Sequence, residues 1–173
     1  MRADRCCLLV LLPLLLPSAA LAAKPPMVSW GKPGVTLAAY REDAVQCGRQ
    51  GYYLDVSNTE AAKVFKDASR QLENNENNIT ASAMTGDTNR IMNMAVDSAR
   101  IVERTQPARR MKEVRTLLQD TVAACLQARG YRQFRLTDSQ QRRLRAFRLG
   151  SPERHAYLHG LASDPAVLET QQL

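Results

Sequence analysis

The spacing of apolar residues along the chain predicts a mainly helical protein. From Thr36, apolar side chains recur every three or four residues, as in an amphipathic helix, and this helix is expected to end near Gly48 or Gly51. The clearest helical pattern begins at Met111 and ends at Gly130. Its apolar positions are Met111, Val114, Leu118, Val122 and Cys125.

Two further helices are expected between these. Ser57 and Glu60 have the spacing of a capping box at a helix start. The apolar face of that helix consists of Ala61, Phe65, Ala68 and Leu72. Residues 73–78 (ENNENN) lack an apolar face and are poor helix formers, so we expect a frayed end or a loop there. A third helix is expected from Asp87 to about Thr105, where a proline stops it. Its expected inward positions are Ile91, Ala95, Ser98 or Ala99, and Val102.

Short helices are expected toward the C-terminus, each with a recognisable start. Thr137 and Gln140 have capping-box spacing, and residues 151–152 (SP) and 164–165 (DP) place a capping side chain before a proline. Only residues 131–136 are expected to be extended. The predicted fold class is therefore all-α, an irregular bundle of about four main helices plus short C-terminal helices.

Residues 1–22 have the features of a secretory signal peptide. Two arginines precede an apolar run, and a small-x-small cleavage pattern ends at Ala22. Neither this proline-interrupted run nor any later one is long enough for a stable membrane span. Residues 23–35, rich in Pro and Gly, are expected to form an extended lead-in rather than a helix or strand. Residues 36–173 are expected to form a single helical domain.

Cleavage of the signal peptide would leave Cys47 and Cys125 as the remaining cysteines. An exported chain matures where thiols oxidise, so one disulfide that ties the bundle is the simplest expectation. A catalytic cysteine would instead need a lowered pKa and a histidine partner, and both histidines lie far along the chain. Two cysteines alone cannot complete a structural zinc site, which needs four ligands.

Two patches of the sequence carry a family resemblance. Residues 30–47 (WGKPGVTLAAYREDAVQC) place a Trp-x-Lys-x-Gly lead-in before a cysteine helix, and residues 125–134 (CLQARGYRQF) place a Gly-Tyr pair after the second cysteine. These patches resemble small exported or lipoprotein-like proteins of Gram-negative bacteria. The resemblance implies a disulfide-tied envelope protein, and since the group has no established reaction, no catalytic residues carry over. Unlike lipidated relatives, this chain has Ala23 and Lys24 where a lipidation cysteine would stand.

Positive charge is concentrated in one third of the chain. The net charge is +7, and residues 104–148 carry twelve Lys or Arg against three Asp or Glu. The densest part contains Arg142, Arg143, Arg145 and Arg148. These side chains could bind an anionic partner such as lipid headgroups or an acidic protein, or form an ordinary solvated helix face. Nucleic acid is not an expected partner, because an exported protein does not meet it and the aromatic platforms of single-strand binders are missing.

His155 and His159 are the candidates for metal binding. They lie four residues apart on a predicted helix, so their side chains share a face. Such a pair can supply two ligands, with Glu153 or Asp164 as a third, or it can be two ordinary surface residues. No motif in the sequence implies a bound cofactor.

Motifs of hydrolytic enzymes are missing from the sequence, which has no Gly-x-Ser-x-Gly, phosphate-binding glycine loop or His-Glu-x-x-His. The adjacent carboxylates Glu42 and Asp43 point different ways on a helix and are expected to be surface charges. The methionines Met84, Met92 and Met94 could line a partner-binding patch or fill a core.

The expected function is that of an exported, non-enzymatic protein of the bacterial envelope with a structural or binding role, and the expected location is the periplasm. Its partner would be an unidentified envelope protein. The first alternative is a binder of an anionic membrane surface or polymer through the basic helix. The second is a metal-binding or enzymatic protein that uses the histidine pair.

Overall fold

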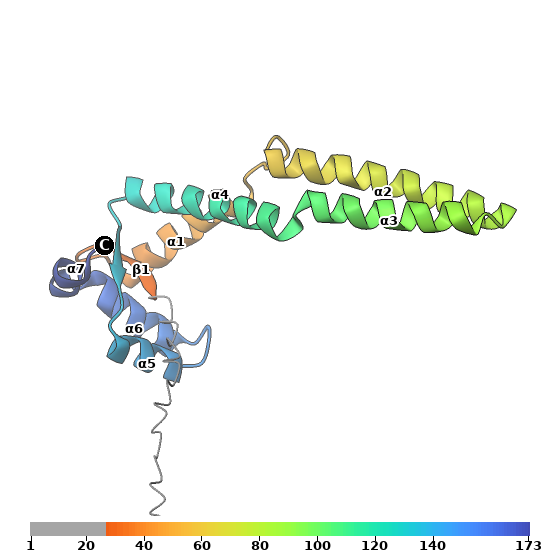
Figure 1. Cartoon of the computed structure of the whole chain (residues 1–173). Helices are drawn as coiled ribbons and strands as arrows, with labels where there is room; N and C mark the ends of the chain where they lie inside the picture. The colour runs from red at the N-terminus through yellow and green to blue at the C-terminus, as the bar shows by residue number, and fades with distance from the viewer. Residues whose placement is uncertain (1–26) are drawn as a thin grey trace, which may run out of the picture.

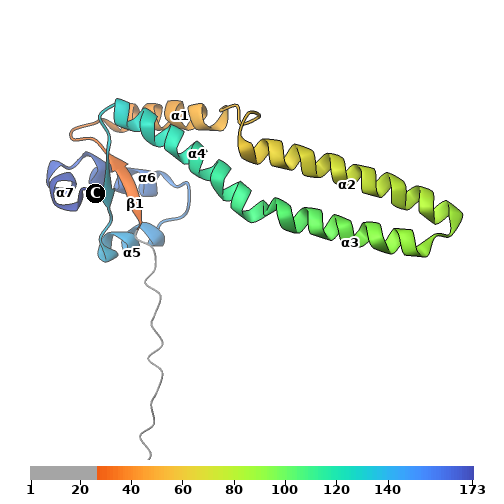
Figure 2. The ribbon, with the colours of Figure 1, turned by 45° about the horizontal axis from the view of Figure 1, so that its top comes forward.

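The chain forms a head from which a long helical arm projects (Figures 1 and 2). The computed structural model describes residues 27–173, so the expected signal peptide, residues 1–22, lies outside the described residues. The elements are, in order, β1 (Val28–Gly31), α1 (Leu37–Tyr52), α2 (Glu60–Thr85), α3 (Thr88–Thr105), α4 (Pro107–Ala128), β2 (Arg132–Arg135), α5 (Asp138–Ala146), α6 (Pro152–Ser163) and α7 (Pro165–Gln171). The predicted all-α class, with four main helices and short C-terminal ones, is confirmed. Within residues 27–173, every helix is too short or too polar to span a bilayer.

The arm is an antiparallel pair of helices joined at Gly86, where the chain turns back in a left-handed backbone conformation. Its contact positions repeat at alternating intervals of three and four residues, which is the heptad pattern of a coiled coil. On α2 the seam positions, all of them less exposed, are Ala61, Phe65, Ala68, Leu72, Asn75, Ile79 and Ser82. On α3 they are Ile91, Met94, Ser98, Ile101 and Thr105. At 1.5 Å per residue, the 26 residues of α2 make the arm about 39 Å long.

The expected loop at residues 73–78 is wrong, because α2 continues through this segment. Asn75 occupies a heptad position, and its Nδ2 donates to Asp97 Oδ2 at 3.0 Å and Ser98 Oγ at 3.1 Å on α3. The neighbouring Asn78 donates to the carbonyl of Asn74 within the helix. Asparagine is only a modestly poor helix former, so these tertiary contacts outweigh its propensity.

The inward face predicted for α3 is partly wrong. Ile91 and Ser98 do face α2, but Ala95, Ala99 and Val102 are exposed. The predicted and the observed positions both alternate steps of three and four residues, and they share Ile91 and Ser98. Instead of stepping to Ala95 and Val102, however, the observed seam steps to Met94 and Ile101. These last two positions could not be separated from their neighbours by apolar character alone.

The junction between α3 and α4 lies near the predicted stop. α3 ends at Thr105, Gln106 takes a left-handed conformation with φ 49°, and Pro107 begins α4 at a position where its missing N–H costs nothing. Figure 2 shows α4 following α3 end to end with a bend at the junction, so that the first part of α4 extends the arm and the last part packs against α1. Met111, expected on the apolar face, is exposed in the arm part.

The head contains a small antiparallel sheet of β1 and β2, in which Trp30 pairs with Gln133. Residues 131–136 were expected to be extended, and β2 confirms this. The lead-in was not expected to form a strand, and residues 28–31 show that this expectation is wrong, because pairing with β2 satisfies their backbone groups. One face of the sheet contributes Phe134 to a core completed by the short helices. That core contains Phe134, Leu136, Leu144, Ala162 and Leu168.

Most helix starts agree with the sequence, although α4 begins at Pro107, four residues before the expected Met111. Thr137 and Gln140 form the predicted capping box, and Ser151 and Asp164 cap α6 and α7. The box predicted from Ser57 is wrong, because the cap of α2 is Thr59, whose Oγ1 accepts from the amide of residue 62 at 3.2 Å.

Candidate functional site

The predicted disulfide is present and joins the C-terminal halves of α1 and α4. Cys47 and Cys125 are linked, with their Cα atoms 5.5 Å apart. Cys47 is fully buried, and a second core surrounds it, made of Cys47, Leu126 and Tyr131 with Trp30 and Val122 packed against them. The disulfide therefore fixes the place where the arm joins the head.

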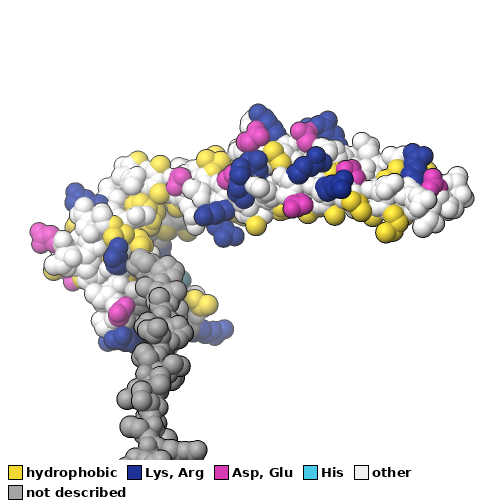
Figure 3. All heavy atoms as spheres, in the orientation of Figure 1, with side chains coloured by type: hydrophobic (Ala, Val, Ile, Leu, Met, Phe, Trp, Pro, Cys, Tyr) yellow, Lys and Arg dark blue, Asp and Glu magenta, His cyan; other side chains and the backbone are white. Residues whose placement is uncertain are grey.

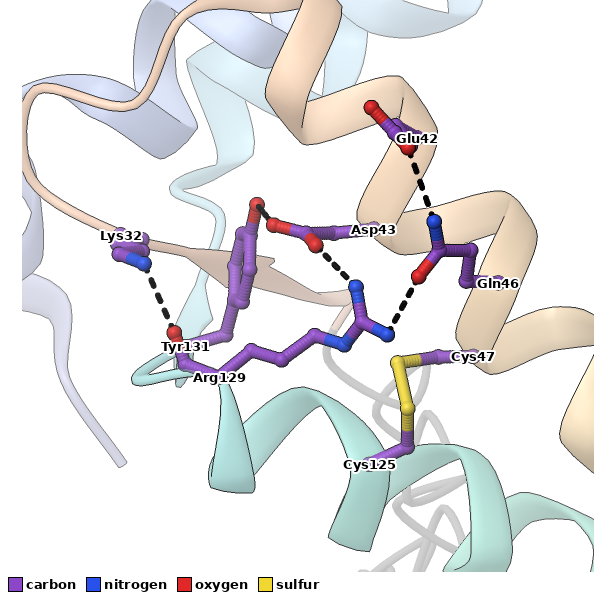
Figure 4. A network of polar contacts seen from close by, with 8 residues as sticks. All are labelled: Lys32, Glu42, Asp43, Gln46, Cys47, Cys125, Arg129 and Tyr131. Carbon is purple, nitrogen blue, oxygen red and sulfur yellow. Dashed lines mark hydrogen bonds and ion pairs between the residues drawn. A yellow bond between two sulfur atoms is a disulfide. The ribbon is translucent and has the colours of Figure 1, made fainter.

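A polar network surrounds the disulfide (Figure 4). The carboxylate of Asp43 on α1 forms an ion pair with Arg129, which follows α4, and accepts from the hydroxyl of Tyr131 at 2.9 Å. Arg129 also donates to Gln46 Oε1 at 2.6 Å. Lys32 donates to the carbonyl of Arg129 at 2.9 Å and lies 5.7 Å from the centre of the Tyr131 ring. The network thus joins α1, the end of α4 and the segment after β1.

The electrostatics of the network favour an ionised carboxylate and a neutral phenol. The hydrogen bond from Arg129, followed by that from Tyr131, lowers the pKa of Asp43 below its ordinary value. Burial, followed by the hydrogen bond to Asp43, raises the pKa of Tyr131. Asp43 therefore stays ionised and Tyr131 stays neutral across the physiological pH range. We call this network the clasp, because its role is structural.

The surface-charge expectation is wrong for Asp43, whose side chain is only 21% exposed. Glu42 is exposed and accepts a hydrogen bond from Gln46 within the same helix. The lead-in and cysteine motifs described above are also brought together here, since Lys32, both cysteines and Tyr131 all belong to the clasp or its core.

An apolar groove of about 620 Å³ lies directly beside the clasp. It lies between one face of the sheet and the helices α1 and α4, which the disulfide holds together. Its lining includes Val28, Trp30, Tyr52, Leu118, Val122 and Gln133. Gly51 also lines the groove. Its lack of a side chain lets α1 pack closely on α4, because a Cβ atom there would overlap with Val122. Sequence reasoning missed the groove, since its residues come from four separate segments.

Tyr52 is the most exposed of the large apolar side chains that line the groove. It is 81% exposed at the end of α1, and its ring contacts that of Tyr53 edge-on, with centroids 5.0 Å apart. A large aromatic side chain that is rigid and half apolar is the residue type most enriched where proteins bind one another.

The four arginines of the basic segment lie on and just after α5, at the end of the head remote from the arm. Arg142, Arg143, Arg145 and Arg148 are all exposed. Arg143 lies over the ring of Tyr157 at 5.4 Å, and Arg145 donates to Gln141 on its own helix. Among the described residues, none of the four arginines forms an ion pair with a carboxylate.

The histidine pair lies on α6, but its two members have different surroundings. His155 is exposed, whereas Nε2 of His159 is 2.7 Å from the carbonyl oxygen of Val35 and its ring packs edge-on against Tyr40. His159 therefore connects α6 to the segment before α1. Within residues 27–173, no three His, Cys, Asp or Glu side chains are grouped so that they could hold a metal ion.

Comparison with known proteins adds no assignment to this geometry. No family model, curated protein or solved structure matches the chain.

Proposed function

We propose that this chain is an exported, non-catalytic protein of the bacterial envelope that binds a protein partner through the groove beside the disulfide. The observation that carries the proposal is an apolar groove whose walls are held by a disulfide and an ion pair and whose rim presents the exposed Tyr52. A preformed apolar surface binds with little loss of conformational entropy. The signal-peptide pattern and the disulfide support an oxidising location such as the periplasm.

The partner proposed is a protein with an apolar or aromatic side chain that fills the groove. The lining is mainly apolar, with Asp120 as its acidic member, so charge contributes little to the attraction. Burial of aromatic and aliphatic side chains at the centre of an interface supplies most of the binding free energy in such complexes.

Photocrosslinking in the native host tests this proposal. A photoreactive phenylalanine analogue is placed at Tyr52, and the matched control carries it at Leu149, which is 82% exposed between α5 and α6. We expect one discrete adduct with another envelope protein from position 52 and none from position 149. Equal adducts from both positions, or adducts with lipid alone, would contradict the proposal.

A second function is favoured by one observation, the exposed arginines that have no carboxylate partner among the described residues. Such a cluster attracts anionic surfaces. If it binds membranes, the protein should co-sediment with anionic vesicles at low salt and be released at high salt. Replacing Arg142, Arg143, Arg145 and Arg148 together by serine should abolish that binding. Equal binding of the variant and the wild type would exclude this function.

A further inference from the structure

An apolar stripe runs along the exposed side of α3. Met92, Val96 and Val102 are 60%, 47% and 47% exposed, although the heptad seam with α2 already uses other positions of this helix. Two exposed alanines complete the stripe, which consists of Met92, Ala95, Val96, Ala99 and Val102. Figure 3 shows apolar side chains gathered along the α3 edge of the arm.

The stripe has the properties of a helix face that lacks its partner. It spans residues 92–102, which is about 15 Å along the helix axis. Ala95 and Ala99 lie within it, and small side chains allow another helix to approach closely. A surface helix that needed only solvent on this side would carry polar residues at these positions.

The charges of the arm identify the kind of partner. The outer half, residues 73–99, has four acidic side chains and one basic, a net charge of −3. The inner half, residues 60–72 and 100–115, has nine basic side chains and four acidic, a net charge of +5. Basic side chains accordingly gather on the half of the arm nearer the head in Figure 3. The arm is thus complementary to a copy of itself that runs in the opposite direction.

We propose that two copies of this chain pair arm against arm, antiparallel, through the α3 stripe, to form a four-helix bundle. A two-fold axis through the middle of the stripe places the acidic outer half of each arm beside the basic inner half of the other. A parallel arrangement would instead oppose like charges along the whole contact. In this bundle the stripe is buried between the two arms, in addition to the seam between α2 and α3 within each arm.

The size of the arm is sufficient for such an interface. With the two-fold axis near residue 97, the overlap of the two arms is twice the distance from that residue to the turn at Gly86, about 33 Å. A two-helix face of that length and roughly 20 Å wide offers about 650 Å² per partner, which is within the size range of specific, stable protein–protein contacts. The heads lie at opposite ends of this assembly, since each arm runs past the other. The groove at Tyr52 therefore stays outside the contact and can act independently.

The first test measures the mass in solution of the purified protein with its disulfide intact, by sedimentation equilibrium. We expect twice the chain mass for the wild type and the single mass for Ala99→Glu, which puts a charge in the middle of the stripe. Asn93→Glu is the matched control, because it adds the same side chain at an exposed position on another side of α3. It should remain dimeric, as should Tyr52→Ser in the groove.

Circular dichroism confirms that each variant is folded. A wild type that stays monomeric at 100 µM would overturn the proposal, and so would an Ala99→Glu protein that stays dimeric. Loss of the dimer in the folded Asn93→Glu protein would likewise overturn it, because the contact would then lie on another side of α3. The groove proposal would stand in each case, since crosslinking from Tyr52 does not depend on the arm.

The second test addresses the orientation. One variant reverses two outer acids (Glu73→Lys, Glu76→Lys) and another reverses two inner lysines (Lys63→Glu, Lys66→Glu). Each reversed protein alone should dimerise more weakly than the wild type, and an equimolar mixture should associate more tightly than either alone. A parallel dimer would give the opposite order, with the wild type weakest and each reversal strengthening association, and that result would overturn the antiparallel arrangement.

Discussion

The residues that matter most for the head lie one helical turn from each cysteine. Asp43 precedes Cys47 by four positions and Arg129 follows Cys125 by four, so each shares a helix side with its cysteine. When the disulfide closes, the carboxylate and the guanidinium meet. The adjacent Glu42 points elsewhere and stays in solvent. The pairing of the cysteines therefore predicts the contact of Asp43 with Arg129. Asp43 is hard to recognise from the sequence alone, because it lies among other charged residues.

Asp43→Asn should destabilise the protein. The substitution keeps the shape of the side chain but removes the negative charge of the carboxylate, which accepts hydrogen bonds from Arg129 and Tyr131. Hydrogen bonds to a charged group contribute more than neutral ones, and partial exposure reduces that contribution, so we expect a loss of about 1 to 2 kcal/mol in the free energy of unfolding. Urea denaturation measures it. Glu42→Gln is the control and should change the stability by less than about 0.5 kcal/mol; equal effects would refute the clasp.

The same carboxylate predicts a pH dependence of stability. The pKa of Asp43 is lowered in the folded state, so its stabilising contribution is fully present above the unfolded pKa of about 3.9. It is lost as the pH falls through the lower folded value. The stability difference between the wild type and Asp43→Asn should therefore be constant near neutral pH and shrink below about pH 4. A difference that grew on acidification would show that another group dominates.

At the level of helices, local signals predicted starts better than continuations. The caps at Thr137, Ser151 and Asp164 depend on side chains next to the helix, and they were predicted correctly. Residues 73–78 were mistaken for a loop because their helicity depends on Asn75 reaching Asp97 and Ser98 on a helix more than twenty residues away. The alternating three-four spacing from Ala61 to Ser82 was the available signal, since it continues unbroken through the asparagine-rich run.

The packing of α1 against α4 depends on a glycine, and a second glycine in the same helix provides the control. A Cβ atom at Gly51 would lie 2.6 Å from Val122 Cγ2 and 3.2 Å from the carbonyl oxygen of Leu118. Gly51→Ala should force the helices apart and lower the melting temperature, at a cost of about 1 to 3 kcal/mol. Gly48→Ala has open space at its Cβ and should stabilise the helix by about 0.5 to 1 kcal/mol. Thermal unfolding measures the melting temperatures of both proteins. If both substitutions shifted the melting temperature in the same direction, the close packing at Gly51 would be refuted.

The division of the whole molecule into head and arm follows from the distribution of apolar residues along the chain. In α2 and α3 the seam positions are satisfied by the partner helix, and most other positions are polar, so nothing draws the arm onto the head. Among the described residues, the three largest fully buried side chains, Tyr131, Phe134 and Leu136, all follow α4. Helix periodicity alone could not predict this division. It shows that each helix has an apolar face, but not which other element packs against that face.

The disulfide should carry a large share of the stability of the whole molecule. It closes a loop of 78 residues that contains the entire arm, and constraining such a loop in the unfolded chain is worth about 4.5 kcal/mol in the chain-entropy model. The double variant Cys47→Ala, Cys125→Ala should therefore melt roughly 10 to 15 °C below the wild type.

Both proteins must be compared at one concentration, because arm-to-arm pairing would make melting temperatures depend on it. Reduced wild type should match the double variant, since both lack the constraint on the unfolded chain. Calorimetry that found less than about 1 kcal/mol between oxidised and reduced protein would mean that the ion pair of Asp43 and Arg129 and the core around Tyr131 hold α1 against α4 without the covalent bond. A large difference would instead show that the disulfide is the main contact that holds the arm on the head, and that the clasp mainly sets the geometry of their junction.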